Sequence, residues 1–591
     1  MSGEPDKAGS VIRGLREAGP RALLLEFAAL DDVLACHQQL TGTPLEGQAD
    51  AVAAARTILL RFTSRTALRA AREVLSVLEV GEFSAGDARQ VELEVVYDGE
   101  DLPELAESLG MSVEALISWH TGQSWTGAFG GFAPGFTYCV PQGSPEAGGQ
   151  PRPLDIPRRS SPRTAVPESS VALAGEFSAV YPRVSPGGWQ LIGRTPQIMW
   201  DLQRSQPGES PALVSPGDTV RYRAVSPESI ELSGRRTAVS ATSSPSDGES
   251  SPTQGEEAGQ EVPALTVVSP GLQTLFQDFG RGGLSDLGVS RAGVADEAAA
   301  LQANRLVGNA PEAAVLESLH GGLELRAEQA VVLAVAGAEP ELTITSEEIT
   351  SGDAASADAQ APDAALPAAL SAPSVRSAPL GAPFLLAAGE RLTVGAPRRG
   401  MRPVLAVRGG LSAEPVLGSV SADTMSGLGP APLEAGQGLA LAGEAPFPVG
   451  ASEQPAEVPD AGPVTLRFTY GPRDDWFSPE EARRLSTQDW LVTQESNRIG
   501  IRLDVDPEDP QARPLERAAG GELPSEGVVR GSLQMPPAGK PVLFLNDHPV
   551  TGGYPVIGVV IDQDLSLAAQ LAPGQRIRLT AVDPDTLEPL T

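Results

Sequence analysis

Lysine, cysteine and aromatic residues are all scarce in this chain of 591 residues. Lys7 and Lys540 are the only lysines, so arginine supplies almost all of the positive charge. Aspartate and glutamate total 76 against 43 basic residues, which gives a net charge of -33. This charge argues against nucleic acid or an anionic membrane as a partner, because both would repel the chain. A locally basic site for a small molecule remains possible within it.

The two cysteines, Cys36 and Cys139, have no metal-type spacing and form no disulfide framework. The first nineteen residues lack the apolar core of a signal peptide. No run of about 18 apolar residues indicates a membrane helix. We therefore expect a reduced, cytoplasmic protein with no membrane-spanning segment.

Several common catalytic motifs are also missing. The sequence has no Walker-type phosphate loop, no C-x-x-C, no H-E-x-x-H and no G-x-S-x-G. Neither lysine lies in a Met-Lys-Met context, so we expect no biotin carrier within the chain. A nucleotide could still bind through a site of another kind.

The chain divides at a segment rich in Ser, Gly, Glu and Pro, Thr237–Val262, which has no aromatic or basic residue. Such a composition cannot bury enough apolar area to offset its ordering entropy, so we interpret it as a flexible tether. A second biased stretch, about 350–379, is rich in Ala, Ser and Pro and predicts a low-complexity insertion. The predicted domains are a flexible N-terminus 1–20, a first domain 21–232, a linker 233–263 and a second domain 264–585.

Two phrases occur in the same order in both halves. PGGWQLIG at 186–193 is matched by TGGYPVIG at 551–558, and PGDTVRYRAV at 216–225 by PGQRIRLTAV at 573–582. The repetition predicts that the halves are distant structural relatives, with the Gly-Gly-aromatic turns in corresponding places. Valine-rich runs that end in glycine predict a strand-rich fold. Helical patterns are weaker and include 66–77, 102–109 and 113–120.

In the first half, residues 120–196 interleave glycine, aromatic and arginine residues. This mixture suits a pocket for a small polar ligand, because arginine binds carboxylate or phosphate through paired hydrogen bonds. The same arginines could instead pair with structural acids. His120 is a candidate general base, or a hydrogen-bonded histidine near a helix end. The substrate-binding candidates of this half are Arg163, Tyr181, Gly187, Gly188 and Arg194.

In the second half, the segments ESNRIGIRL, SEGVVRGSLQMPP and NDHPVTGGYP bring a donor, acceptors and a phenol beside an exposed backbone turn. Asp547 is a candidate for activating water and Tyr554 for donating to a developing oxyanion, so both are proposed as catalytic. Each residue could equally belong to a turn or barrel rim. The substrate-binding candidates here are Arg498, Gln534, Gly552 and Gly553.

These motifs resemble those of the B and C subunits of bacterial 5-oxoprolinase fused in one chain, also called allophanate hydrolase subunits 1 and 2. Kip-type kinase regulators and the carboxyltransferase part of urea carboxylase are similar. The first half carries GFAPGF, PRxxxPRTxVP and SPGGWQLIGRTP; the second carries PGLQTxxQDxGR, ANRLVGN, SxRxGxRL and TGGYP. The resemblance implies a β-rich α+β fold, with tandem cyclophilin-like β-barrel subdomains and flanking helices. Pro549-Val550 and Asn497 depart from the family pattern, which usually has Gln-Thr and Asp at these places.

The activity implied by the resemblance is opening of 5-oxo-L-proline to L-glutamate with ATP and Mg, together with a separate 5-oxoprolinase A subunit. ATP would activate the lactam carbonyl, chemistry that depends on electrostatic stabilisation and positioning. One alternative is a carboxyltransferase component that takes carboxyl from carboxybiotin, as in urea carboxylase. Another is a non-enzymatic regulator that binds a histidine kinase.

Overall fold

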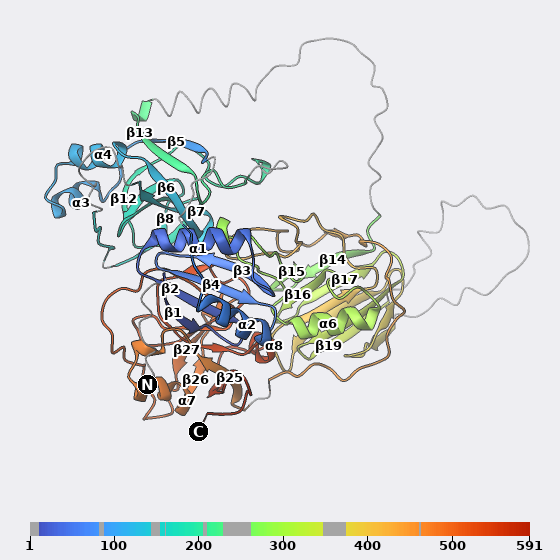
Figure 1. Ribbon diagram of the computed structural model, residues 1–591. Coiled ribbons are helices and arrows are strands. Elements are labelled where there is room, and N and C mark those ends of the chain that lie inside the picture. Colours follow the sequence, from blue (N-terminus) through green and yellow to red (C-terminus); the bar gives the residue numbers. More distant parts are fainter. Residues whose placement is uncertain are drawn as a thin grey trace, which may run out of the picture.

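The computed structural model describes residues 11–81, 88–142, 154–159, 161–204, 210–228, 262–346, 374–459 and 462–590. These form four units: the sheet unit (11–81), the first barrel (88–228), the sandwich (262–459) and the second barrel (462–590). Figure 1 shows the sheet unit between the two barrels, with the sandwich beside them. The predicted tether and insertion lie largely outside the described residues, since 229–261 and 347–373 are not among them.

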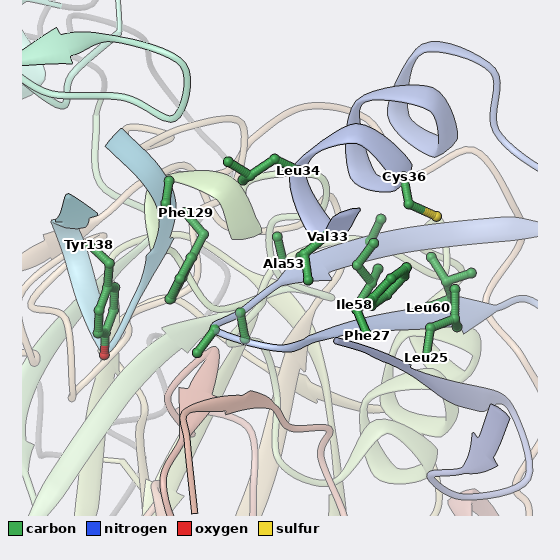
Figure 2. Close-up of a cluster of buried hydrophobic side chains, with 14 of the residues drawn as sticks. Leu25, Phe27, Val33, Leu34, Cys36, Ala53, Ile58, Leu60, Phe129 and Tyr138 are labelled. Carbon is green, nitrogen blue, oxygen red and sulfur yellow. The ribbon is translucent and has the colours of Figure 1, made fainter. Parts of the chain in front are cut away.

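The sheet unit is an antiparallel sheet of order β1-β2-β4-β3 covered by two helices. Helix α2 follows from its sequence, because Leu68, Ala71 and Leu75 recur on one buried face and Ser64 caps the N-terminus. The sheet and α1 enclose an apolar core, drawn in Figure 2. The elements are β1 (Ile12–Glu17), β2 (Ala22–Phe27), α1 (Leu30–Gly42), β3 (Gln48–Ala53), β4 (Thr57–Phe62) and α2 (Arg65–Leu75).

The first barrel has seven main strands in the order β12-β9-β10-β7-β6-β13-β5, and an antiparallel bridge between Val96 and Arg194 joins its two ends. The predicted helices at 102–109 and 113–120 are confirmed. The elements are β5 (Gln90–Val95), α3 (Leu102–Ser108), α4 (Val113–Thr121), β6 (Trp125–Gly131), β7 (Ala133–Pro141), β8 (Arg163–Val166), β9 (Ser170–Ala174), β10 (Phe177–Val180), β11 (Ser185–Gly187), β12 (Gln190–Arg194), η1 (Leu202–Arg204) and β13 (Thr219–Ala224).

The sandwich packs a six-stranded sheet, β20-β19-β22-β17-β14-β24, against a five-stranded sheet, β15-β16-β23-β18-β21. Its elements are β14 (Leu265–Pro270), β15 (Gln273–Gln277), η2 (Ser285–Leu287), α6 (Glu297–Val307), β16 (Val315–Leu319), β17 (Leu323–Ala327), β18 (Val331–Gly337), β19 (Pro340–Thr345), β20 (Val375–Ser377), β21 (Phe384–Leu386), β22 (Arg391–Pro397), β23 (Pro403–Val407) and β24 (Gly438–Leu439). Helix α6 covers the second sheet through β18 and β23.

The second barrel is closed, in the order β25-β32-β29-β30-β27-β26-β33. Its elements are β25 (Val464–Tyr470), η3 (Asp474–Trp476), α7 (Pro479–Thr487), β26 (Asp489–Val492), β27 (Gly500–Val505), β28 (Glu526–Gly527), β29 (Ser532–Gln534), β30 (Val542–Phe544), β31 (Thr551–Gly552), β32 (Val556–Val560), α8 (Asp562–Ala569) and β33 (Arg576–Ala581). The expected fold of tandem β-barrels with flanking helices is therefore what the chain adopts. No helix within the described residues is long and apolar enough to span a membrane.

The two barrels have the same topology. The Val96–Arg194 bridge closes the first barrel. Its strands then follow one another around the barrel in the same order as the equivalent strands of the second barrel. The last strand of each barrel is parallel to the first strand and antiparallel to the second. Each barrel also has a two-stranded ribbon, β8 with β11 and β28 with β31. The repeated phrases thus mark two copies of one structural plan.

The Gly-Gly-aromatic turns occupy corresponding places, as the sequence predicts. Each turn links the second ribbon strand to the next barrel strand, β11 to β12 and β31 to β32. The registers agree too, since Gly99 donates to the Ile192 carbonyl and Gly471 to the Ile557 carbonyl. Trp189 and Tyr554 are therefore equivalent positions.

The seam between the halves is close-packed at glycine. A methyl group on Gly130 would overlap the Asp286 carbonyl, and one on Gly131 would overlap the Thr551 side chain. The Phe132 amide also donates to the Thr551 hydroxyl oxygen at 3.2 Å. These contacts tie the first barrel to both units of the second half.

We expect the halves to stay associated when the chain is cut in the predicted tether. A protease site inserted within 237–262 should yield two fragments that co-elute on size exclusion as the uncut protein does, because the seam is built without the tether. Separation of the fragments at micromolar concentration would show instead that the tether holds them together.

Candidate functional site

A cavity of about 560 Å³ lies on the seam and is lined by both halves. We call it the seam pocket. It is bordered by β7, by the turn between β3 and β4, and by residues 522–525 of the second barrel. Its polar lining residues are Arg56, Tyr138, Asp155, Arg158, Glu176, Glu522 and Ser525.

Tyr138 is central to this pocket. It lies on β7, at the edge of the core that Figure 2 draws, with its hydroxyl directed away from α1. Burial raises the pKa of Tyr138, and hydrogen bonding by Ser525, the Arg158 charge and Thr551 lower it in part. The phenol is therefore neutral and hydrogen-bonded by side chains from the other half, so it can donate a proton in a hydrogen bond to a ligand.

Arg158 is one of two arginines that line the seam pocket, the other being Arg56. Its nearest carboxylate is Glu522, with an Nε–Oε2 distance of 3.7 Å, and about a third of its side chain is exposed. A guanidinium with so loose a partner is free to bind a carboxylate through paired hydrogen bonds. A methyl group on Gly553 would lie 3.4 Å from Arg158 Nη1, so this turn glycine keeps the guanidinium approachable.

Tyr181, Gly187 and Gly188 lie on the first-half side of this region. Tyr181 is buried among aromatic rings, and the Trp189 amide donates to its hydroxyl oxygen. Burial raises the pKa of Tyr181, and the nearby Tyr138 raises it further. Gly187 is required here, because a side chain would overlap the Tyr181 hydroxyl. Gly188 lies beside Pro162.

Gln534, Gly552, Gly553 and Tyr554 lie on the second-half side. A methyl group on Gly552 would overlap the Gln534 amide nitrogen, so the turn packs directly on this buried glutamine. Tyr554 is 41% exposed, and the Arg517 guanidinium lies 5.8 Å from the centre of its ring. These four residues, like Tyr181, Gly187 and Gly188, do not line the seam pocket itself, although Gly553 lies next to Arg158.

Arg163 occupies a structural ion pair. Its Nη2 lies 2.8 Å from the Asp101 carboxylate, which also accepts from the Leu191 amide. Asp101 directly precedes α3, and its side chain binds these groups and does not cap the helix. In the second barrel the equivalent pair is Arg473 with Glu526, so the signs are reversed between the barrels. Arg473 bonds also to Glu26 of the sheet unit, at 2.5 Å.

Arg194 lies away from the seam pocket. Its side chain is about half exposed, and its Nε donates to Asp98 at 2.9 Å. This is a surface ion pair of the kind that contributes roughly 0–1 kcal/mol.

Asp547 and Arg498 form a buried network where the second barrel meets the sandwich. Asp547 is fully buried and accepts from the Thr424 amide at 2.9 Å, from the Thr424 hydroxyl at 2.6 Å and twice from Arg498 at 3.1 Å. Arg498 also bonds to Glu317 and to the Gly293 carbonyl. Burial raises the pKa of Asp547, and the Arg498 charge opposes that rise. The side chains of Asp547 and Arg498 are thus engaged by other residues of the second barrel and the sandwich, which favours a structural role in joining these two units.

His120 is buried in the core of the first barrel. Its Nδ1 lies 2.7 Å from the Tyr97 hydroxyl and its Nε2 lies 2.9 Å from Ser178 Oγ. The equivalent residue of the second barrel is Leu485, because the indoles of Trp125 and Trp490 donate to the carbonyls of His120 and Leu485 in the same i, i+5 pattern. An apolar equivalent favours a packing role over that of a general base.

Tyr138, Ser525 and Thr551 were not among the residues singled out from the sequence, and Arg158 was only one of several arginines in a dense segment. The signal that marks Tyr138 is its place in FGGFAPGFTY, where each of the strand residues up to Cys139 is buried. Its pairing with Ser525 depends on contact between the halves, which spacing along the chain does not reveal.

Both halves of the chain match family models of the carboxyltransferase domain. A family model described as carboxyltransferase domain, subdomain A and B, matches residues 287–362 and 364–581, and one described as subdomain C and D matches 14–210. The chain is 31% identical over 318 residues to the C subunit of 5-oxoprolinase from Escherichia coli K12, covering 53% of this chain and 89% of that protein. It is 36% identical over 169 residues to the B subunit of 5-oxoprolinase from Escherichia coli O157:H7, covering 28% and 72%.

Two further likenesses concern longer stretches. The crystal structure of TTHA0988 superposes with a TM-score of 0.73 at 31% identity, covering 95% of this chain and 99% of that one. Urea amidolyase of Lachancea kluyveri is 27% identical over 341 residues, which is 54% of this chain but 17% of that much longer protein.

We expect His120→Leu to fold and to lose part of the acid sensitivity of the protein. Burial lowers the pKa of His120 from 6.5 to about 3, so the folded state favours the neutral ring. This stabilisation is present above pH 6.5 and is lost as pH falls toward 3, by up to about 1.4 kcal/mol per pH unit. As pH is lowered from 7 to 4.5, the urea concentration at the unfolding midpoint should fall less steeply for the variant than for the parent protein. Equal slopes would contradict this account.

We expect Asp547→Asn to lower the free energy of unfolding by about 3 kcal/mol, because it leaves buried Arg498 less compensated. The control is Asp504→Asn, whose surface pair with Lys540 at 2.8 Å should contribute less than about 1 kcal/mol. Urea midpoints measure both. A normally stable Asp547→Asn protein that had lost about 10²–10⁴-fold in turnover would instead identify Asp547 as a general base.

Proposed function

This chain belongs to the carboxyltransferase-domain family that includes the B and C subunits of 5-oxoprolinase, and on that basis we propose that it is the fused B–C component of an ATP-dependent 5-oxoprolinase. The reaction would open 5-oxo-L-proline to L-glutamate. A protein like the A subunit of 5-oxoprolinase would be its partner. Separate B and C subunits of 5-oxoprolinase match 28% and 53% of this chain, which supports a fusion of the two.

The observation that supports this proposal best is that the seam pocket is built by both halves. Tyr138 and Arg158 come from the first barrel, and Ser525 comes from the second. A reaction that needs both types of protein accounts for a pocket that neither half could form alone. Its volume of about 560 Å³ is ample for a five-membered lactam with one carboxylate.

The lining groups match the two polar ends of such a substrate. Arg158 would bind the carboxylate, because its guanidinium has only a loose partner at 3.7 Å. Tyr138 and Ser525 would hydrogen-bond the lactam, with the neutral phenol donating to the carbonyl oxygen as negative charge develops there. ATP, when bound, would supply the phosphoryl group that activates this carbonyl. The residues of this chain would orient the lactam for its activation and for the attack of the water that opens it.

A carboxyltransferase activity is the second candidate, since the chain is similar to urea amidolyase over 341 residues. Such an activity would need a biotin carboxylase and a biotin carrier on other chains. The two candidates differ in the cosubstrate, because only the first consumes ATP with 5-oxoproline in the absence of biotin.

We expect 5-oxoproline-dependent ATP hydrolysis when this chain is combined with its matching 5-oxoprolinase A subunit, and none with either protein alone. Arg158→Gln should lower kcat/KM by roughly 10- to 100-fold through loss of a charge-assisted contact, mainly by raising KM. Tyr138→Phe should lower kcat by a similar factor. Arg194→Gln, a matched change on the surface, should leave both constants unchanged. Equal activity in all three variants would remove the seam pocket from the reaction.

A further inference from the structure

A second cavity, of about 450 Å³, lies where the sheet unit, the sandwich and the second barrel meet. It shares no lining residue with the seam pocket. We call it the junction cavity. Charged residues line it despite its position between three units: Arg21, Arg61, Arg281, Arg291 and Arg530, with Asp50, Glu297 and Asp562.

The arginines of the junction cavity outnumber its acids by five to three. Three of them have carboxylate partners there: Arg21 with Asp562 at 2.7 Å, Arg61 with Asp50 at 3.8 Å and Arg530 with Glu297 at 2.6 Å. Arg281 and Arg291 form no salt bridge with any residue that the structure describes. In a chain with a net charge of -33, two cations without a bound carboxylate in one cavity indicate an anionic ligand.

Of the two arginines, Arg281 gives the stronger evidence for an anionic ligand. It is 3% exposed, and its Nε and Nη2 donate only to the carbonyls of Val416 and Ser421, at 3.3 and 2.5 Å. Its Nη1 has no hydrogen-bond partner among the described residues. Burial lowers the pKa of Arg281 because the carboxylates around it, Asp423 foremost, only partly offset the cost of desolvation. Leaving such a buried donor unpaired is costly.

The backbone after Arg281 adds further donors. The amides of Gly282, Gly283 and Leu284 donate no hydrogen bond to any of the described residues, and all three residues line the cavity. A methyl group on Gly282 or Gly283 would meet nothing within 4 Å, so the backbone there is open. Consecutive free amides beside guanidinium groups form the kind of concave donor surface that binds phosphate.

The same cavity also offers an acceptor. Asn546 and His548 both line it, and Asn546 is buried. His548 Nδ1 lies 2.7 Å from the Pro549 carbonyl and must donate to it, which leaves Nε2 as an acceptor. Burial lowers the pKa of His548 to about 4, so the ring stays neutral. The ligand should therefore carry a hydroxyl or other donor near its anionic end.

We propose that the junction cavity binds the phosphoryl group of a small phosphorylated molecule. Two guanidinium groups without carboxylate partners and three free amides offer more donors than the two oxygens of one carboxylate can accept. A phosphoryl group has three terminal oxygens and a charge near -2, which matches this donor set. The assignment stands on the cavity alone and holds whether or not the seam pocket opens a lactam.

The test is calorimetric titration of the full chain with pyrophosphate and with ATP, without metal, at low ionic strength. We expect saturable binding of at least one of them. Arg291→Gln should weaken it about tenfold, because loss of one charge-assisted contact is of that size. Arg291 suits the test since it is exposed and donates to a single backbone carbonyl, at 3.0 Å. The control is Arg398→Gln, a mostly exposed arginine outside the cavity, which should bind as the parent does.

Hydrogen exchange gives a second measurement that does not depend on a variant. Pyrophosphate or ATP should slow exchange of the amides of 282–284 and leave 522–525 of the seam pocket unaffected. Tighter binding of L-glutamate or 5-oxoproline than of pyrophosphate, with the same protection, would make this a carboxylate site and overturn the proposal. Absence of phosphate binding at millimolar concentration, or equal binding by the Arg291→Gln and parent proteins, would also overturn it.

Discussion

The arrangement of the two halves depends on close backbone contact at glycine. Gly130 and Gly131 end β6 with no side chain, and this lets the first barrel approach the Asp286 carbonyl on one side and Thr551 on the other. A Cβ at either position would overlap these groups and force the halves apart. The seam pocket is bounded by residues on both sides of that contact, so its shape is set by two glycines that are not among its lining residues.

The two barrels share one topology but differ in the side chains at equivalent positions. Trp125 and Trp490 close equivalent corners through the same indole hydrogen bond, yet the residue that accepts it is a histidine in one barrel and a leucine in the other. The first barrel places Tyr138 at the seam. The second barrel provides Thr551 and the loop 522–525, which face it. Only together do they enclose a pocket with donors from both.

The fold could be predicted well from the sequence because its signals are local. Valine-rich runs, capped helices such as α2 and the repeated phrases each depend on a few neighbouring residues, and the equivalence of Trp189 and Tyr554 followed from order alone. The candidate site was harder to predict. Arg498, a predicted substrate-binding residue, and Asp547, a predicted catalytic one, are 49 residues apart, and their burial between two units favours a structural role. Tyr138 meets Ser525 only through packing of the halves, which no local pattern encodes.

The ion pairs of reversed sign bear on how this chain can evolve. A crossover that replaced the ribbon of one barrel with that of the other would set Glu526 against Asp101, or Arg163 against Arg473, in sites with little water. Uncompensated like charges there would cost several kcal/mol. Two segments of one gene that still share a topology are thereby protected from exchanging parts with each other.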